Sequence, residues 1–219
     1  MTQILEARKG NITPEMEAVA RAEGVSLDHV IEGVANGTIV ITRNRVHTNI
    51  TPLGVGKGLR TKINANIGTS KDRMSIDGEI EKLKAAVAAG ADAVMDLSTG
   101  GPIVGIRTEI LKQSTVAIGT VPIYQAAVET VEQGKPIVQM DPDLLFRVIE
   151  QQAEEGVDFV TVHCGVTISS LERLKRQGRI MDVVSRGGAF HIEWIIYNGA
   201  ENPLFTQFER LIEIAKKYD

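Results

Sequence analysis

The chain has 219 residues, of which 43% are hydrophobic and 24% are charged. This length fits one large domain or two small ones, and the composition excludes disordered and fibrous proteins. With 24 basic and 28 acidic residues the formal charge is only −4, so the sequence does not favour nucleic acid or an anionic membrane as a partner. The single cysteine, Cys164, excludes an internal disulfide.

The beginning of the chain carries no apolar stretch of signal-peptide length, and no segment reaches the roughly 20 apolar residues of a membrane span. We therefore expect a cytoplasmic protein without a membrane partner.

Residues 1–59 are interpreted as a short N-terminal extension that is partly helical and partly irregular. Its first helix has clear signals, because Thr13 can cap it, Pro14 suits the first helical position and Gly24 can end it. A second helix is expected over residues 26–35, followed by extended or irregular chain.

From residue 60 to residue 219, short strand-type runs alternate with longer stretches of helical periodicity. Strands are expected at residues 61–67, 93–97, 116–123, 159–163 and 182–185. Helices are expected at residues 76–89, 102–112, 125–133, 143–155, 169–177, 189–197 and 203–217. Such alternation implies parallel strands joined by helical crossovers.

Two parallel folds fit this alternation, the open doubly wound sheet and the (β/α)8 barrel. The glycine-rich residues 54–58 precede the first expected strand, and Thr51 stands where a phosphate-binding loop needs its first glycine, so they are interpreted as a flexible turn. Polar segments follow each strand, as in barrel enzymes. Because a complete barrel has eight strands and we expect about five, the sequence predicts an incomplete (β/α)8 TIM-type barrel with outer helices. Its two open edges should promote aggregation or oligomerisation.

Five motifs in chain order carry a resemblance to a known family. They are KINANIG at residues 62–68, VMDLSTG at 94–100, IGTVPIY at 118–124, GVDF at 156–159 and VSRGG at 184–188. The sequence resembles the phosphomethylpyrimidine synthases of thiamine biosynthesis. The resemblance implies a lyase with a barrel fold that rearranges 5-aminoimidazole ribotide by radical chemistry, using S-adenosylmethionine and a [4Fe–4S] cluster. A homodimer is implied for the complete enzyme.

The resemblance also implies a set of substrate contacts, which fall at or just beyond the carboxyl ends of the five expected strands. These are Asn66, Met95, Tyr124, His163, Ser185, Arg186 and Gly187. No catalytic residue and no metal ligand is assigned among them.

The last three of these residues have chemistry that suits a phosphate. Arg186 offers a planar fork of donors, and Ser185 adds a hydroxyl. Gly187 and Gly188 let backbone N–H groups approach an anion at the start of a helix. An arginine in this place is also common as a surface ion pair.

The other four suit a nucleotide-like ligand. The Asn66 amide can donate and accept, Tyr124 carries a hydroxyl on a rigid ring, and His163 can hydrogen-bond or move a proton near neutral pH. Met95 can make apolar contact with a ring. Two of them also have a structural interpretation: Met95 as core filler and His163 as a structural hydrogen-bonding residue.

Three further residues attract attention by type. Asp96 is a single carboxylate in a turn, so it is left out of the site. Cys164 is interpreted as a small buried hydrophobe. His191 lies on a helix interpreted as outer-layer packing and not as a metal site.

The sequence also departs from the family pattern. One cysteine cannot supply the family's Cys-x2-Cys-x4-Cys cluster motif, and the family's histidine site for a divalent metal such as zinc has no counterpart here. We therefore expect this chain alone to be inactive. Two alternatives stay open: a 5-hydroxybenzimidazole synthase that uses the same ribotide, and a non-catalytic half-barrel that binds it.

Overall fold

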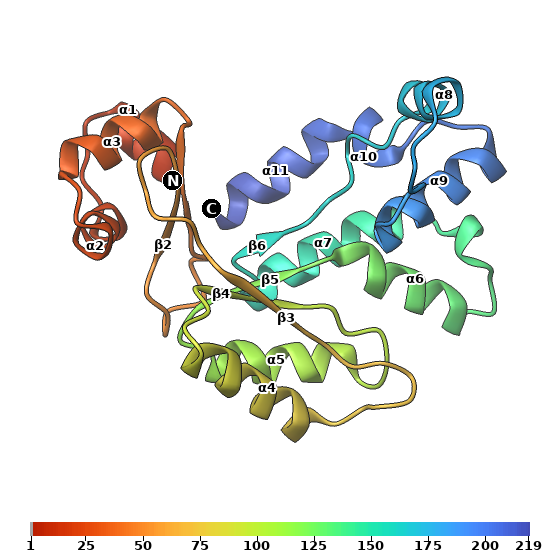
Figure 1. The fold of residues 1–219 in the computed structure, drawn as a ribbon, viewed down its shortest axis with the longest axis horizontal. Coiled ribbons are helices and arrows are strands. Elements are labelled where there is room, and N and C mark those ends of the chain that lie inside the picture. Colours follow the sequence, from red (N-terminus) through yellow and green to blue (C-terminus); the bar gives the residue numbers. More distant parts are fainter. Residues whose placement is uncertain (1) are drawn as a thin grey trace. The chain divides into compact units, whose positions relative to one another are not determined.

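The computed structural model describes residues 2–219 as an α/β protein with a parallel and an antiparallel sheet (Figure 1). Contacts within the chain divide it into two compact units, which are described separately. Unit 1 comprises residues 2–120 with Ala153–Phe159 and Ala215–Asp219, and unit 2 comprises Val121–Gln152 and Val160–Ile214. The predicted division into residues 1–59 and 60–219 stays a prediction.

Unit 1 begins with three helices, α1 (Gln3–Arg8), α2 (Pro14–Glu23) and α3 (Leu27–Ala35). The expected signals bound α2: the Thr13 hydroxyl accepts a hydrogen bond from the Met16 N–H, and Gly24 takes a left-handed φ of 66°. Ser26 caps α3 in the same way. The helices share an apolar cluster in which Met16 and Val19 are fully buried. Capping and burial together explain why this segment is helical.

An antiparallel pair follows, formed by β1 (Ile39–Thr42) and β2 (Leu53–Gly56). The interpretation of residues 54–58 as a flexible turn is therefore wrong for the first three residues. The glycines serve close packing: a Cβ on Gly54 would lie 2.4 Å from Val19 Cγ1, and one on Gly56 would lie 2.2 Å from the Thr38 carbonyl oxygen.

The parallel sheet has the order β3 (Asn64–Ile67), β4 (Ala93–Asp96), β5 (Ala117–Thr120) and β6 (Phe159–Val160). Helices α4 (Ile76–Ala88) and α5 (Ile103–Gln113) follow β3 and β4 and pack against each other beside the sheet (Figure 1). Alternation along the strands buries Ile67, Val94 and Ile118, while the register places Asn66 beside Met95.

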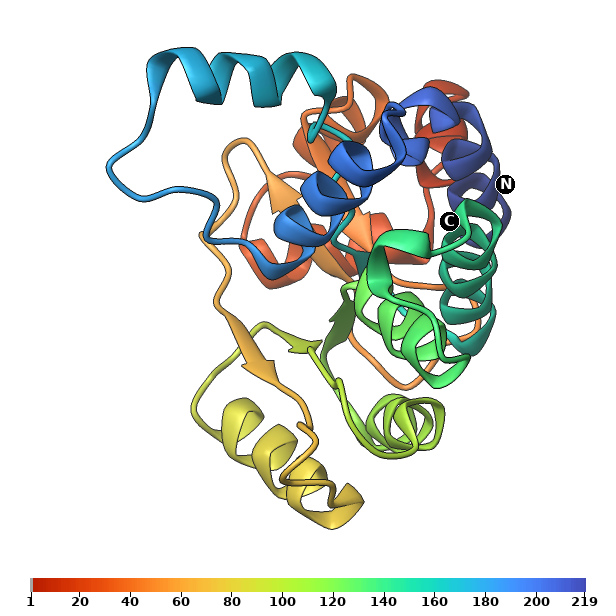
Figure 2. The same ribbon diagram turned by 90° about the vertical axis from the view of Figure 1, so that its right-hand side faces the viewer.

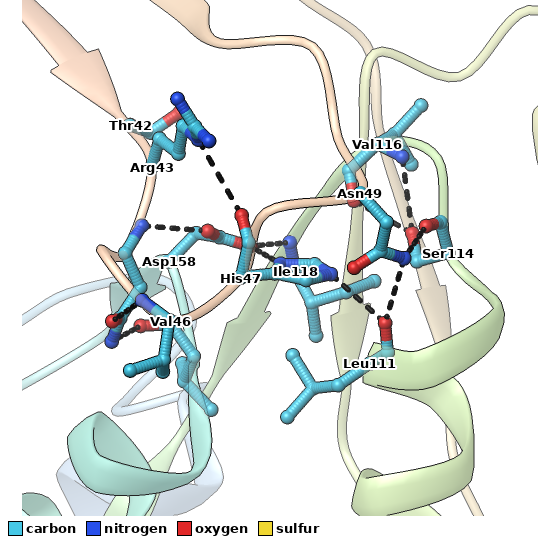
Figure 3. Close-up of polar contacts among 12 residues, drawn as sticks. Thr42, Arg43, Val46, His47, Asn49, Leu111, Ser114, Val116, Ile118 and Asp158 are labelled. Carbon is cyan, nitrogen blue, oxygen red and sulfur yellow. Dashed lines mark hydrogen bonds and ion pairs between the residues drawn. The ribbon is translucent and has the colours of Figure 1, made fainter.

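A buried carboxylate joins three segments of unit 1 (Figure 3). Asp158, whose side chain is 0% exposed, accepts hydrogen bonds from the backbone N–H groups of Asn44 and Ile118, each at 2.8 Å. Its Oδ2 also lies 2.7 Å from Nδ1 of His47, whose Nε2 lies 2.9 Å from the Leu111 carbonyl oxygen. The chain after β1, strand β5 and the start of β6 therefore depend on the same side chain.

Replacing Asp158 with alanine should lower the free energy of unfolding by about 3–5 kcal/mol, because two buried N–H groups and the His47 ring lose their acceptor. Urea denaturation followed by circular dichroism measures the change. Asp72→Ala is the matched control, since Asp72 is exposed, and should alter stability by less than about 0.5 kcal/mol. Equal effects of the two substitutions would contradict the role given to the buried carboxylate.

The regular elements of unit 2 are helices, apart from Val160 of β6. Its elements are α6 (Pro122–Glu132), the 3-10 helix η1 (Ile137–Gln139), α8 (Ile168–Gln177), α9 (Arg186–Asn198) and α10 (Pro203–Thr206), together with most of α7 (Pro142–Glu155) and α11 (Phe208–Tyr218). The Trp194 indole N–H donates to the Met140 carbonyl at 2.9 Å and ties α9 to the end of η1. The helices expected from periodicity are present, with the last one broken at Gln207.

The expected count of five parallel strands is wrong, because the described residues form four. Residues 182–185, the expected fifth strand, belong to an extended loop between α8 and α9 (Figure 2). Ile180, Met181 and Val184 in or near this segment are exposed, at 107%, 66% and 70%. The valines resemble a strand in composition, but no neighbouring strand among residues 2–219 pairs with them. An α/β fold with a four-stranded parallel sheet is what the structure has.

Candidate functional site

The predicted substrate contacts are found in both units. Unit 1 holds Asn66 and Met95, and unit 2 holds Tyr124, His163, Ser185, Arg186 and Gly187. The first two lie near the carboxyl ends of β3 and β4, and Tyr124 and His163 follow β5 and β6, as expected. The last three begin α9 and do not follow a strand, which corrects the sequence interpretation.

Asn66 and Met95 are neighbours on one face of the parallel sheet. Asn66 is exposed and Met95 is partly buried, and Asn64 Nδ2 lies 3.4 Å from Asn66 Oδ1. On β5 the face continues at Gly119, where a Cβ would lie 2.2 Å from the Phe159 ring. The face therefore offers amides, a thioether and an aromatic ring, a combination that suits a flat heterocycle.

The loops that follow β3 and β4 are fastened to each other. The Thr69 N–H donates to Ser98 Oγ at 3.1 Å, and the Thr69 hydroxyl donates to the Gly100 carbonyl at 2.6 Å. Gly68 has a φ of 145°, and a Cβ there would lie 2.6 Å from the Leu97 carbonyl carbon. These polar and glycine residues hold the sheet end together, so they support the candidate face and do not themselves form it.

Gly68→Ala should destabilise the protein by about 2–4 kcal/mol, since the new methyl group meets backbone atoms and the residue must keep a positive φ. Gly90→Ala is the matched control: Gly90 also has a positive φ, 90°, but has open space around its missing Cβ. It should cost only about 1–2 kcal/mol. Urea denaturation of both variants tests the difference, and a cost for Gly90→Ala as large as for Gly68→Ala would show that steric contact is not the cause.

In unit 2, His163 is held against the first turn of α9. Its Nε2 lies 3.0 Å from Ser185 Oγ, and Ser185 caps the helix by accepting the Gly188 N–H at 3.1 Å. A Cβ on Gly187 would lie 2.3 Å from His163 Cε1, so the glycine makes room for the ring. One of the two N–H groups that the sequence offered to an anion, that of Gly188, is therefore already engaged.

Arg186 and Tyr124 form a second contact within this unit. The Arg186 guanidinium carbon lies 5.1 Å from the centre of the Tyr124 ring, a cation–π geometry. The ring also meets Phe190 edge-on, at 6.4 Å between centroids. Arg186 is exposed, so its donors are free to reach an anion while its plane rests on the ring.

A pocket of about 370 Å³ lies beside His163 and Ser185 within unit 2. Side chains of α8 and of the loop after it complete the lining, among them Arg173, Leu174 and Arg179. The volume is in the range of small-molecule sites, and two guanidinium groups make the pocket suitable for an anionic ligand.

Two residues that sequence reasoning did not assign to the site lie next to His163. Asn202, fully buried, donates from its amide to the carbonyls of His163 and Val166, both at 2.9 Å. His191 is 1% exposed, and its ring centre lies 5.6 Å from that of His163. The sequence Asn202-Pro203 is typical of a helix start and could have marked Asn202 as a structural residue. Nothing in the sequence around His191 indicated that it lies next to His163.

Burial governs the titration of this group. Burial, together with the smaller effect of charge on the neighbouring His163, lowers the pKa of His191 to about 4. Burial also lowers the pKa of His163 and raises that of the Cys164 thiol. Both rings are therefore neutral near pH 7, and Cys164 is a thiol.

Stability should fall as the pH is lowered from about 6.5 to about 4, because in this window the unfolded chain binds a proton at His191 that the folded protein does not. Over this pH range His191 should lower the free energy of unfolding by on the order of 3 kcal/mol. Urea denaturation at several pH values should show that His191→Leu removes this part of the acid loss. His29→Leu, on helix α3, is the control and should keep it; parallel curves for wild type and His191→Leu would refute the assignment.

Within residues 2–219 no three histidine, cysteine or acidic side chains converge as metal ligands. The helices of this part of the chain are all too short or too polar to cross a bilayer.

The four-stranded parallel sheet, with helices that follow its strands, defines an α/β protein. The model of the radical SAM ThiC family matches residues 2–219, and the chain belongs to this family.

Curated proteins named phosphomethylpyrimidine synthase are similar over the whole chain, which confirms the resemblance drawn from the motifs. Those of Caldanaerobacter subterraneus subsp. tengcongensis, Geobacter metallireducens and Thermodesulfovibrio yellowstonii are 58%, 57% and 57% identical over 219 residues. These alignments cover 100% of this chain and 51%, 50% and 51% of the relatives. The chain spans about half the length of the curated relatives it matches.

Proposed function

We propose that this chain is the ribotide-binding part of a phosphomethylpyrimidine synthase, which rearranges 5-aminoimidazole ribotide into hydroxymethylpyrimidine phosphate. Membership of the radical SAM ThiC family supports the reaction class. The observation that carries the binding role is the grouping at the start of α9, where His163 contacts Ser185 and Gly187 and Arg186 rests on Tyr124.

Each residue of this group has a role that its chemistry supports. The Arg186 fork binds the phosphate, because its donors are exposed and its plane is already oriented by Tyr124. The Tyr124 hydroxyl and His163 contact the ribose or its phosphate. Asn66 and Met95 remain proposed contacts of the heterocycle, because their face offers an amide and a polarisable sulfur.

We also propose that the four-stranded parallel sheet is part of a TIM-type barrel, and that the complete enzyme is a homodimer. The strand order β3-β4-β5-β6 follows the chain order, as it does around a barrel, and helices α4 and α5 follow the first two strands. Candidate contacts near the carboxyl ends of β3 and β4 agree with barrel enzymes, whose sites lie at that end.

The family implies a [4Fe–4S] cluster and S-adenosylmethionine, but the residues of this chain do not fit a cluster. Such clusters are held by several cysteine thiolates, and the chain has one cysteine, whose pKa burial raises. We therefore assign no step of the radical chemistry to this chain. Its own contribution is to bind and orient the ribotide.

Isothermal titration calorimetry with 5-aminoimidazole ribotide tests the binding role. Arg186→Ala should weaken binding about 10- to 100-fold, because a charge-assisted hydrogen bond to phosphate contributes roughly 1.5–3 kcal/mol. Arg186→Lys should recover only part of the loss, since an ammonium group lacks the planar fork.

The matched control is Arg147→Ala, which removes an exposed arginine from helix α7 of the same unit and should leave the affinity unchanged. Binding that is equally weakened by Arg147→Ala would indicate a non-specific charge effect. The absence of any heat with the wild-type chain would refute ribotide binding.

A further inference from the structure

The neighbouring rings of His163 and His191 leave one nitrogen each without a hydrogen-bond partner among the described residues. These atoms are Nδ1 of His163 and Nε2 of His191, and both are buried. The ring centres are 5.6 Å apart and the ring planes are tilted by 43°. Because buried polar atoms almost always have a partner, two such atoms on adjacent rings call for a common explanation.

Helix α9 brings the two rings together. Gly187 and His191 are four residues apart, so they lie on one face of the helix, one turn from each other. At Gly187 the missing Cβ leaves the space that the His163 ring occupies. One face of the helix therefore first makes room for His163 and then, a turn later, places a second imidazole beside it.

Ser185 determines which nitrogen of His163 carries the proton. Its Oγ accepts the Gly188 N–H at 3.1 Å and lies 3.0 Å from His163 Nε2. A hydroxyl oxygen that already accepts a hydrogen bond is a better donor, so the Ser185 O–H is directed at Nε2. A neutral His163 ring that accepts at Nε2 carries its proton on Nδ1, the atom without a partner.

We propose that His191 is a positioning residue for His163: its Nε2 accepts a hydrogen bond from one buried water, which in turn accepts the His163 Nδ1–H. A single bridging water then satisfies both unpartnered nitrogens. The hydrogen bonds run in one direction, from Ser185 to His163 and through the water to His191, and they hold the His163 ring in one tautomer and one orientation.

This tautomer determines what His163 can recognise. Its Nε2 presents a lone pair on the side of Ser185, and both residues line the same pocket. In the ligand-free protein the Ser185 O–H occupies this lone pair. An O–H or N–H group of a ligand, such as a ribose hydroxyl, can donate to His163 Nε2 when it replaces the Ser185 hydroxyl as the donor, and the phosphate is left to Arg186. This consequence rests on the proposed function, whereas the water-bridged contact with His191 does not.

The titration of the pair agrees with this arrangement. Burial lowers the pKa of both rings, that of His191 to about 4, so His191 is neutral near pH 7 and can accept at Nε2. Within residues 2–219 no group of three metal-ligating side chains includes the two rings.

Long-range ¹H–¹⁵N correlation spectra of the uniformly labelled, ligand-free protein at pH 7 test the tautomer. The chain has four histidines, so single-histidine variants assign the signals. We expect His163 to show a protonated Nδ1 and an unprotonated Nε2, and His191 to show an unprotonated Nε2. A His163 ring protonated at Nε2 in the wild-type protein would overturn the proposal, whatever the variants show.

Two variants of His191 separate positioning from simple packing. His191→Leu removes the acceptor, so the Nδ1–H form of His163 should lose its dominance. His191→Gln keeps an acceptor oxygen and should restore it. A native amide spectrum with an unchanged His163 tautomer in His191→Leu would overturn the proposal; if that variant does not fold, the wild-type spectrum and His191→Gln decide.

Calorimetry with 5-aminoimidazole ribotide links the tautomer to binding. We expect His191→Leu to weaken binding about tenfold and His191→Gln to recover most of it, as for one misplaced hydrogen bond. Failure of the wild-type chain to bind would refute the proposed function but leave the tautomer result intact. An affinity unaltered in His191→Leu would overturn the positioning role.

Discussion

Unit 1 depends on one constraint: a carboxylate without access to water must receive its hydrogen bonds from the protein. Asp158 meets this need with three donors from two other segments: the Asn44 N–H and the His47 ring from the chain after β1, and the Ile118 N–H from β5. Its own backbone N–H donates to the Ile118 carbonyl at 2.9 Å, so side chain and main chain together place the start of β6 against β5. The N-terminal helices and hairpin become part of the same unit as the sheet because the chain after β1 cannot leave without exposing that charge.

In unit 2 the side chains proposed to bind the ligand are positioned in a different way. The His163 ring fits against α9 because Gly187 has no Cβ, and the His163 carbonyl accepts a hydrogen bond from the amide of the fully buried Asn202. Arg186, in contrast, is exposed and oriented only by the face of Tyr124. A rigid histidine beside an adaptable arginine suits a ligand with a neutral sugar and a charged phosphate, because only the neutral contacts need exact donors and acceptors.

Sequence reasoning succeeded where neighbours along the chain decide the outcome. The caps at Thr13 and Ser26, and the periodicity of α4 and α9, produce helices close to the predicted bounds. It failed where the partner is distant. The valines before Ser185 have strand composition but no strand to pair with, and the glycines of β2 resemble a turn until Val19 and Thr38 are placed against them.

The sequence by itself determined the family, through five short motifs. The proposed ribotide contacts follow from that resemblance, and residue type shows only which hydrogen bonds and charges each of them can offer. Only the tertiary structure decided that the Gly188 N–H donates to the Ser185 hydroxyl, that Asp158 is buried, and that His191 lies beside His163. The reason is physical: charge state, tautomer and free hydrogen-bonding capacity depend on burial and on neighbours 20 or more residues away, and these exist only once the chain has packed.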